Sequence, residues 1–289
     1  MKKTIVVAAV FSAIIITSSC SVSDMRKGTE LYKVDIAQSV DQIKGRQILN
    51  AYVIENGYDK FSSVETYQVK AREHWKGMMG NMGNPWPEKN LSYVMKFVPD
   101  LNEFTNQIKL SSEKKNGDVW GMKKTLSSVY YQKKGAERKP IKEGKESFML
   151  ANYQWWIEFP YRLNQLENVT FAGVKEKNGE IYDLVLATWG DDLKAKKDFD
   201  QYMLWFNQST GLIDLVTFTY RDVPMMMPPF MYGTALFDDY RVVNGIRMPF
   251  SQKFQINGPS EKSKYAHHFM IDNIEFDIFS KEYLLSIKK

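Results

Sequence analysis

The sequence is poor in the residues that most often build metal sites and disulfides. Among its 289 residues there is one cysteine, Cys20, and there are three histidines. A single cysteine excludes an intrachain disulfide framework and a cysteine-based zinc site. The formal net charge of +5 is also too mild to indicate binding to nucleic acid. The stability of the fold must therefore come from a hydrophobic core, which a chain with 44% hydrophobic residues can supply.

Motifs for common catalytic chemistries are also missing. The sequence contains no glycine-rich phosphate loop, no G-x-S-x-G elbow and no H-E-x-x-H helix. His267 and His268 are adjacent in an expected strand, so their side chains should point to opposite faces, and His74 is the remaining histidine. The acidic pairs at 191–192 and 238–239 could serve a glycosidase, but they resemble solvated turns. We expect no enzyme activity, no cofactor and no metal.

The first twenty residues read MKKTIVVAAVFSAIIITSSC and have the parts of a secretory signal: two lysines, an apolar stretch and small residues before a cysteine. The apolar stretch is short for a membrane span. The segment before Cys20 resembles a bacterial lipobox, which predicts a signal peptide over 1–19 and a diacylated Cys20 as first mature residue. The alternative is an ordinary secretory signal with a chance cysteine. Removing Lys2 and Lys3 would lower the net charge by two.

The mature part divides into a short polar segment and one domain. Residues 20–37 are polar and mixed in charge and are expected to carry the lipid and act as a tether. Residues 38–289 should form a single domain. It begins with a helix from about Ser39, because apolar residues recur there at three to five positions until Gly57 stops the pattern.

Most of the remaining chain has the period of two that is typical of strands. Short runs rich in β-formers alternate with turns such as Asn116-Gly117 and Asn244-Gly245, which predicts a meandering antiparallel sheet of about ten or eleven strands. The stretch 145–166 interrupts this pattern with dense aromatic residues and Pro160. It should form one or two short helices, and Pro249 should lie on an edge or bulge.

Three stretches together resemble the LolA/LolB-like superfamily of outer-membrane lipoprotein sorting, in a Bacteroidetes-type lipoprotein. They read ILNAYVIENGYDKFSSVETYQVKARE, YMLWFNQSTGLIDLVTFTY and FDDYRVVNGIRMPFSQKF. The resemblance covers about 40–279 and implies a mainly β fold with α: an incomplete, strongly curved antiparallel β-barrel, with helices as a lid over an interior that binds acyl chains. The chain is longer than the sorting proteins, and the carrier's inward-pointing arginine has no match here.

Two segments combine methionine with proline and aromatic residues: GMMGNMGNPWPEKN at 77–90 and VPMMMPPFMYG at 223–233. Methionine suits surfaces that accept apolar partners of variable shape. We expect both segments to be non-helical loops that form the rim of an apolar cavity or touch the bilayer. The predicted lipid-binding residues are Met78, Met79, Met82, Trp86, Met225, Met226, Met227, Phe230 and Met231 on the rim, with Trp155, Trp156 and Phe159 in the lid.

Other interpretations of these residues stay open. The loops could fold back as ordinary packing, and the lid aromatics could be core. Methionine thioethers could also hold Cu(I), or the loops could meet a protein partner.

The sequence favours a non-enzymatic, membrane-anchored lipoprotein that binds a lipid or acylated molecule. An outer-membrane scaffold lipoprotein with a filled barrel and an envelope protein partner is the alternative, and a hydrolase of envelope glycans is a third. The residue after Cys20 is Ser21. An aspartate at this position would signal retention in the inner membrane, so the serine favours the outer membrane. Acyl chains and the membrane are thus the expected partners.

Overall fold

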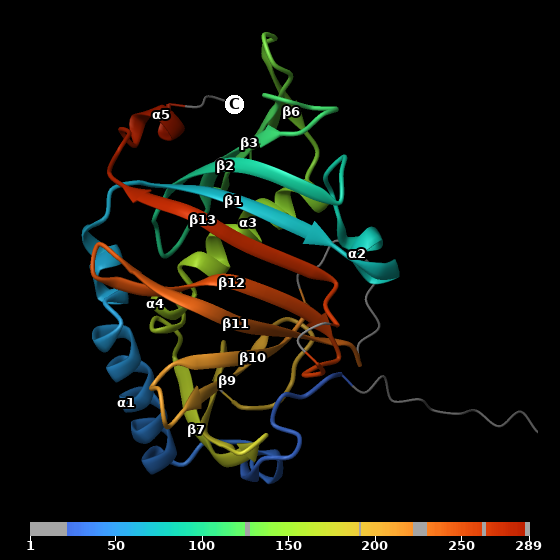
Figure 1. Ribbon diagram of the computed structural model, residues 1–289. Coiled ribbons are helices and arrows are strands. Elements are labelled where there is room, and N and C mark those ends of the chain that lie inside the picture. The colour runs from blue at the N-terminus through green and yellow to red at the C-terminus, as the bar shows by residue number, and fades with distance from the viewer. Residues whose placement is uncertain (1–21, 125–127, 191, 222–229, 262–263, 287–289) are drawn as a thin grey trace, which may run out of the picture.

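A single antiparallel sheet dominates the computed structural model, which describes residues 22–124, 128–190, 192–221, 230–261 and 264–286 (Figure 1). The 13 described strands follow the spatial order β6-β5-β4-β3-β2-β1-β13-β12-β11-β10-β9-β8-β7. Their bounds are β1 Tyr67–Trp75, β2 Asn90–Val98, β3 Thr105–Ser111, β4 Val119–Lys123, β5 Ser128–Gln132, β6 Arg138–Ile141, β7 Asn168–Lys177, β8 Glu180–Thr188, β9 Gln201–Asn207, β10 Ile213–Thr219, β11 Tyr232–Val243, β12 Ile246–Ile256 and β13 His267–Phe276. The curved sheet is open, with β6 and β7 as its edges, so the expected fold class is confirmed.

The sheet consists of two meanders that meet in its middle. Strands β1 to β6 run outward to one edge, and β7 to β13 run inward from the other edge. The meanders join where β1 pairs antiparallel with β13, from Tyr67 opposite Phe276 to Trp75 opposite His267. Because β6 and β7 are consecutive strands at opposite edges, the chain between them must cross the open side.

Two helices make that crossing: α3 (Lys145–Ile157) and α4 (Phe159–Leu163). Pro160 stands at the start of α4, where proline needs no backbone N–H partner, and the helical direction changes at this point. One or two short helices were expected around Pro160, and the structure has two. They carry buried side chains into the concave interior, so α3 is packed inside the curve of the sheet.

Helix α1 (Ser39–Glu55) confirms the predicted N-terminal helix and packs across β7. The two elements approach closely at Gly45, where an added Cβ would lie 2.5 Å from the backbone nitrogen of Phe171. The chain leaves the helix at Gly57, which has φ 72°. A Cβ at Gly57 would lie 2.1 Å from the carbonyl oxygen of Gly245, so glycine is required there for both conformation and space.

Several local features differ from the expectation. The sheet has more strands than the ten or eleven expected. Strand β6 was not predicted because it is short and contains Pro140, which is tolerated here since β6 is an edge strand. The segment Gly77–Gly83, expected to be a loop, forms helix α2. Pro249 was expected on an edge or bulge, but β12 lies between β11 and β13 in the sheet. The proline is tolerated because it stands outside the stretch 251–254 over which β12 pairs with β13. Shorter elements are η1 (Glu30–Lys33), η2 (Tyr58–Ser63) and α5 (Glu282–Leu285).

The two faces of the sheet bury different clusters. On the concave face the largest cluster gathers inward side chains of both meanders with α1, α3 and α4. A second cluster lies on the convex face of β8 to β11, where Leu184, Met203 and Trp205 meet Met25 and Leu31. Every residue of β9 is therefore buried, because both faces of this strand are covered.

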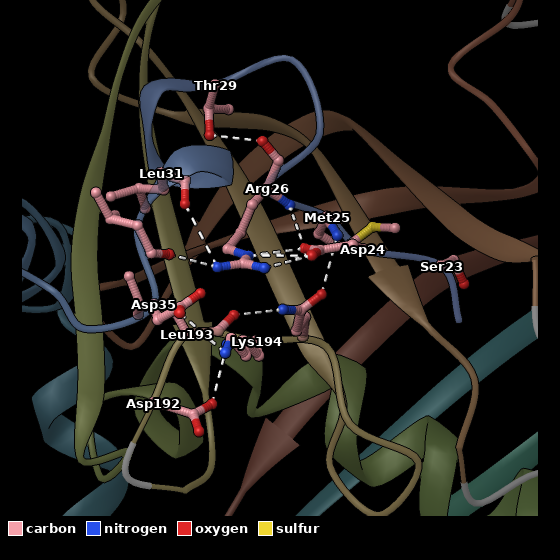
Figure 2. A network of polar contacts seen from close by, with 12 residues as sticks. Ser23, Asp24, Met25, Arg26, Thr29, Leu31, Asp35, Asp192, Leu193 and Lys194 are labelled. Carbon is pink, nitrogen blue, oxygen red and sulfur yellow. Dashed lines mark hydrogen bonds and ion pairs between the residues drawn. The ribbon is translucent and has the colours of Figure 1, made fainter. Parts of the chain in front are cut away.

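The convex cover is the segment 22–37, which was expected to be a tether and instead packs on the sheet (Figure 2). Its fold is organised around the buried Arg26. The guanidinium forms a bidentate pair with Asp24, Nε to Oδ1 and Nη2 to Oδ2, and donates to the carbonyl oxygen of Val34 at 2.6 Å. The backbone N–H of Met25 donates to Gln201 Oε1 at 2.9 Å. These contacts give a polar sequence enough partners to stay docked.

The same segment is hydrogen-bonded to the chain on either side of residues 222–229. Ser23 Oγ donates to the carbonyl oxygen of Met231 at 2.9 Å, and Arg221 Nη2 donates to the carbonyl oxygen of Ser23 at 2.9 Å.

In the part of the chain that the structure describes, no helix is long and apolar enough to cross a membrane.

Candidate functional site

Two cavities flank α3 inside the curve of the sheet. The larger, about 620 Å³, lies between α3, β4–β5 and β9–β10. The smaller, about 120 Å³, lies between α2, α3 and β12–β13. Five side chains line both cavities: Phe148, Asn152, Trp156, Phe218 and Tyr220. Helix α3 therefore divides one interior space, and aromatic rings form much of its lining.

The first methionine segment lies at the end of the sheet where the smaller cavity is found. Helix α2 follows β1 directly, and Met79 and Gly83 line that cavity. Met78 and Met82 are 73% and 50% exposed. Lys145 Nζ on α3 donates to the carbonyl oxygen of Met82 at 2.6 Å, so a cationic side chain joins α2 to α3 at the cavity.

The second methionine segment is described only at its C-terminal end. Phe230 is 62% exposed and Met231 is partly buried. Met225, Met226 and Met227, like Cys20, lie outside the described residues. Strand register places Tyr232 at the same sheet end as α2, because Gly233 pairs with Ile256 and Phe254 pairs with His267. The described ends of both methionine segments thus share one end of the sheet.

The predicted tryptophans lie deeper than the rim. Trp86 is buried, with its ring 5.7 Å from that of Trp120, and its Nε1–H donates to Tyr153 Oη at 2.9 Å. The Trp86 ring is therefore not available to insert into a bilayer, contrary to what was expected of an exposed rim loop. Trp155 lines the larger cavity, and Trp156 lines both. Phe159 is buried behind them, with its ring 4.8 Å from that of Trp156.

A buried polar cluster centred on Glu73 lies beside the smaller cavity. Glu73 Oε2 accepts from Tyr93 Oη at 3.0 Å and from Tyr153 Oη at 2.5 Å. His267 Nε2 lies 3.0 Å from the same oxygen, so we assign the proton of this bond to the imidazole. Burial, and next the charge of Glu73, holds the pKa of Tyr93 and of Tyr153 well above its ordinary value. Both phenols therefore stay protonated and donate.

A second buried pair fixes the helices that cross the interior. Glu158, between α3 and α4, accepts from Arg162 Nε at 2.7 Å and from Tyr67 Oη at 2.8 Å. The guanidinium of Arg162 also donates to the carbonyl oxygens of Asp100 and Glu103 in the β2–β3 loop. Because a buried guanidinium and carboxylate need all their partners, this arrangement holds α3 in one position relative to β1–β3.

The described wall of the smaller cavity offers few groups for covalent or metal chemistry. The described residues that line the smaller cavity include no serine, threonine or cysteine that His267 could activate. Among the described residues, no three His, Cys, Asp or Glu side chains are grouped to hold a metal. For the Cu(I) alternative, Met79 faces the cavity whereas Met78 and Met82 are exposed.

The adjacent histidines lie on opposite faces of β13, as predicted. His267 is buried on the concave face, whereas His268 Nε2 lies 2.9 Å from Ser251 Oγ on the convex face. Burial, followed by the positive charges of Lys253 and its neighbours, lowers the pKa of His268 from 6.5 to about 4.

Sequence reasoning missed the Glu73 cluster, although a signal existed. In the alternating pattern of β1, Glu73 is in phase with the apolar Val69, Ala71 and Trp75. A carboxylate on the apolar face of a strand calls for buried partners. The partners could not be identified, since Tyr153 and His267 lie 80 and 194 positions away in the chain.

Comparison with known proteins finds solved structures that have a similar fold. No protein-family model and no curated protein matches the chain. A DUF1329 family protein from Desulfovibrio piger matches with TM-score 0.53 and 11% identity, over 84% of this chain and 97% of that one. A LolA superfamily protein from Nitrosomonas europaea matches with TM-score 0.49 and 12% identity, over 83% and 96%. The first likeness establishes a shared fold.

The architecture implied by the LolA/LolB resemblance, an open curved sheet with helices in its concavity, is confirmed at the level of the fold. The Bacteroidetes type stays a prediction.

Glu73→Ala, which removes the side-chain acceptor, should destabilise the protein more than Glu73→Gln, which keeps an acceptor oxygen. In Glu73→Ala, two phenol O–H groups and one imidazole N–H lose their buried acceptor, so we expect a loss of about 3 kcal/mol in the free energy of unfolding. Glu73→Gln keeps an acceptor oxygen and should lose about 1 kcal/mol. Urea denaturation measures both, with the exposed Glu65→Ala as control. Equal losses for Glu73→Ala and Glu73→Gln would contradict the acceptor role.

Acid should weaken the fold in part through His268. Its folded-state pKa lies below the unfolded value, so the unfolded chain binds the proton first and stability falls as pH drops from 6.5 toward about 4. His268→Gln should flatten this dependence. Thermal midpoints compared between about pH 7 and about pH 4.5 test it. An unchanged slope in the variant would show that His268 does not titrate in this window.

Proposed function

We propose that this chain is a membrane-anchored envelope lipoprotein that holds an acyl chain or lipid in the cavities beside α3, without covalent chemistry. The observation that carries the proposal is the divided interior of about 620 Å³ and about 120 Å³ within a curved sheet. Trp156, Phe148 and Phe218 line both parts. Each methylene buried in such a space contributes about 0.8 kcal/mol, so apolar burial can bind an acyl chain tightly.

The position of the N-terminal segment supports an anchored orientation. Ser23 is bonded to Met231 and Arg221, at the sheet end that carries α2 and the smaller cavity. Cys20 precedes Val22 by two residues, a reach of at most about 7 Å. A lipid on Cys20 would therefore bring this end of the sheet to the bilayer, where exposed Met78, Met82 and Phe230 could contact lipid.

The scaffold alternative also has an observation in its favour. Large side chains fill much of the concave face: Tyr67, Tyr93, Phe97 and Phe269 are fully buried there. An interior occupied by the protein's own rings would need no ligand, and the exposed methionines would then meet a protein partner. An envelope localisation, most simply the outer membrane, fits both proposals.

A charge introduced into the shared wall should abolish acyl binding. Phe148 lines both cavities, so Phe148→Asp should weaken uptake of a fluorescent fatty acid by tenfold or more, because the carboxylate is costly beside an acyl chain. Displacement titration on the full chain carrying Cys20→Ser measures this, and native mass spectrometry identifies any lipid that co-purifies. Val174→Asp, exposed on β7, is the matched control. Folded parent protein that takes up no fatty acid would favour the scaffold.

Anchoring depends on Cys20 alone in this proposal. Cys20→Ser should move the protein from the membrane fraction to the soluble fraction of the envelope, because the acyl chains supply the membrane affinity. Ser21→Ala keeps the cysteine and should stay with the membrane. Mass spectrometry of the N-terminal peptide should find a diacylglyceryl group. A Cys20→Ser protein that still resists a high-salt wash would overturn the lipid anchor.

A further inference from the structure

The larger cavity is lined mainly by aromatic rings rather than by aliphatic side chains. Phenylalanine, tyrosine and tryptophan are the commonest residues in its described lining, and leucine and isoleucine do not occur among those residues. The aliphatic members are Met122, Val129 and Ala151. A saturated acyl chain would be buried equally well by aliphatic side chains, because the hydrophobic effect depends on apolar area. The aromatic lining therefore indicates a more specific ligand.

Five of these rings contact one another and form a continuous wall. The Tyr202 ring on β9 has its centroid 5.5 Å from that of Trp155, 5.8 Å from that of Trp189 and 6.0 Å from that of Phe218. The centroids of Trp155 and Trp189 are themselves 5.8 Å apart. Trp156 lies 4.8 Å from Phe218. The wall thus runs from α3 across the ends of β8, β9 and β10.

Part of this wall is open to the cavity. Trp155 and Trp189 are both partly exposed. Trp155 Nε1 is buried, so Trp155 meets the cavity with its ring and not with its N–H. Two side chains that line the cavity beside the wall lie over Gly233, where an added Cβ would be 2.5 Å from Phe218 Cζ and from Tyr220 Oη. Because glycine has no Cβ, both rings can lie close to the sheet.

The chemistry of such a wall distinguishes flat ligands from flexible ones. Aromatic faces and edges gain energy from stacked or edge-on contacts with other flat π-systems, in addition to the area that is buried. A saturated chain makes no such contact, and it loses rotamer freedom when it is held in one conformation. A conjugated polyene or a quinone ring is already flat and rigid, so it gains the contact at a smaller entropic cost.

The size of the cavity allows a whole segment of a lipid to enter. Its volume of about 620 Å³ is ordinary for a site that takes a small molecule. Phe148 and Trp156 line both cavities, so a chain that leaves the wall can continue past α3 into the smaller one.

We propose that the larger cavity selects a lipid that contains a flat conjugated segment, such as a polyene or a quinone, which stacks on Trp155, Trp189 and Tyr202. This inference rests on the proposed acyl binding and names the ligand class. The three residues are then specificity residues, since they distinguish a conjugated lipid from a saturated one.

The test compares two acids of equal chain length: octadecanoic acid and trans-parinaric acid, its all-trans conjugated tetraene. The tetraene is fluorescent, so direct titration of the delipidated full chain carrying Cys20→Ser gives its dissociation constant, and displacement gives that of octadecanoic acid. Trans-parinaric acid should bind about tenfold more tightly, because two or more ring contacts form with it alone. Energy transfer from tryptophan to the bound tetraene should be strong.

Variants separate stacking from folding. Trp155→Leu and Trp189→Leu each remove a ring and keep an apolar side chain, so each should reduce the preference to within about threefold. Both should still bind octadecanoic acid, which is the internal control for folding. Trp189→Phe restores a ring and should recover most of the preference. Trp120→Leu is the matched control, because Trp120 belongs to the concave cluster but lines neither cavity. It should keep the preference.

Each outcome decides a separate claim. Equal affinity of the parent protein for the two acids would overturn selection of a conjugated segment and leave acyl binding intact. A preference that persists in both Trp155→Leu and Trp189→Leu, or that disappears equally in Trp120→Leu, would overturn the assignment to this wall. If the folded parent binds neither acid, acyl binding itself is wrong, and this proposal with it.

Discussion

The pairing of β1 with β13 is the constraint on which the rest of the structure depends. It places the join between the two meanders in the middle of the sheet and leaves β6 and β7, consecutive in the chain, at opposite edges. The connection between them has to span the open side of the curve. A polar loop could not fill that apolar concavity, whereas a helix satisfies its own backbone hydrogen bonds and can present aromatic side chains on several faces. Helix α3 is the result.

This connection also explains why the interior is divided rather than simply open or filled. Helix α3 is held on one side by the pair Glu158 and Arg162, and on the other side Tyr153 donates to Glu73. With the helix held at both places, space remains on either flank. The buried polar contacts therefore set the shape of the cavities as well as the position of the helix. A core held by apolar contacts alone would have more freedom to close around α3.

The convex face poses a different requirement. Strands β8 to β11 carry apolar residues on both sides, so the outer side needs a cover, and the segment around Arg26 supplies it (Figure 2). The docking of this segment also determines where residue 20 can lie. Under the proposed lipid anchor, residue 20 would act on one end of the sheet, next to the smaller cavity, and this polar segment would then set the orientation of the domain.

Much of the fold follows from local patterns. The helix from Ser39 to Glu55 follows from apolar spacing and Gly57, and most strands follow from alternation between turn residues. The short edge strand with Pro140 and the helix formed by GMMGNMG did not follow, because pairing and packing overrode weak local preferences. Which side of a strand faces inward was also undetermined, since strands such as β9 are apolar on both faces.

For the candidate site, too, some features could be predicted from the sequence and others could not. Residue types and their order in the chain were enough to predict an apolar interior crossed by aromatic helices, and the secretory signal stays a prediction. Only the tertiary structure brought Glu73 to His267 and buried Trp86, because those relations depend on the register of β1 with β13 and on the route of α3 across the sheet. A one-residue change in that register would turn Glu73 or His267 to the other face, so no local pattern could specify their meeting.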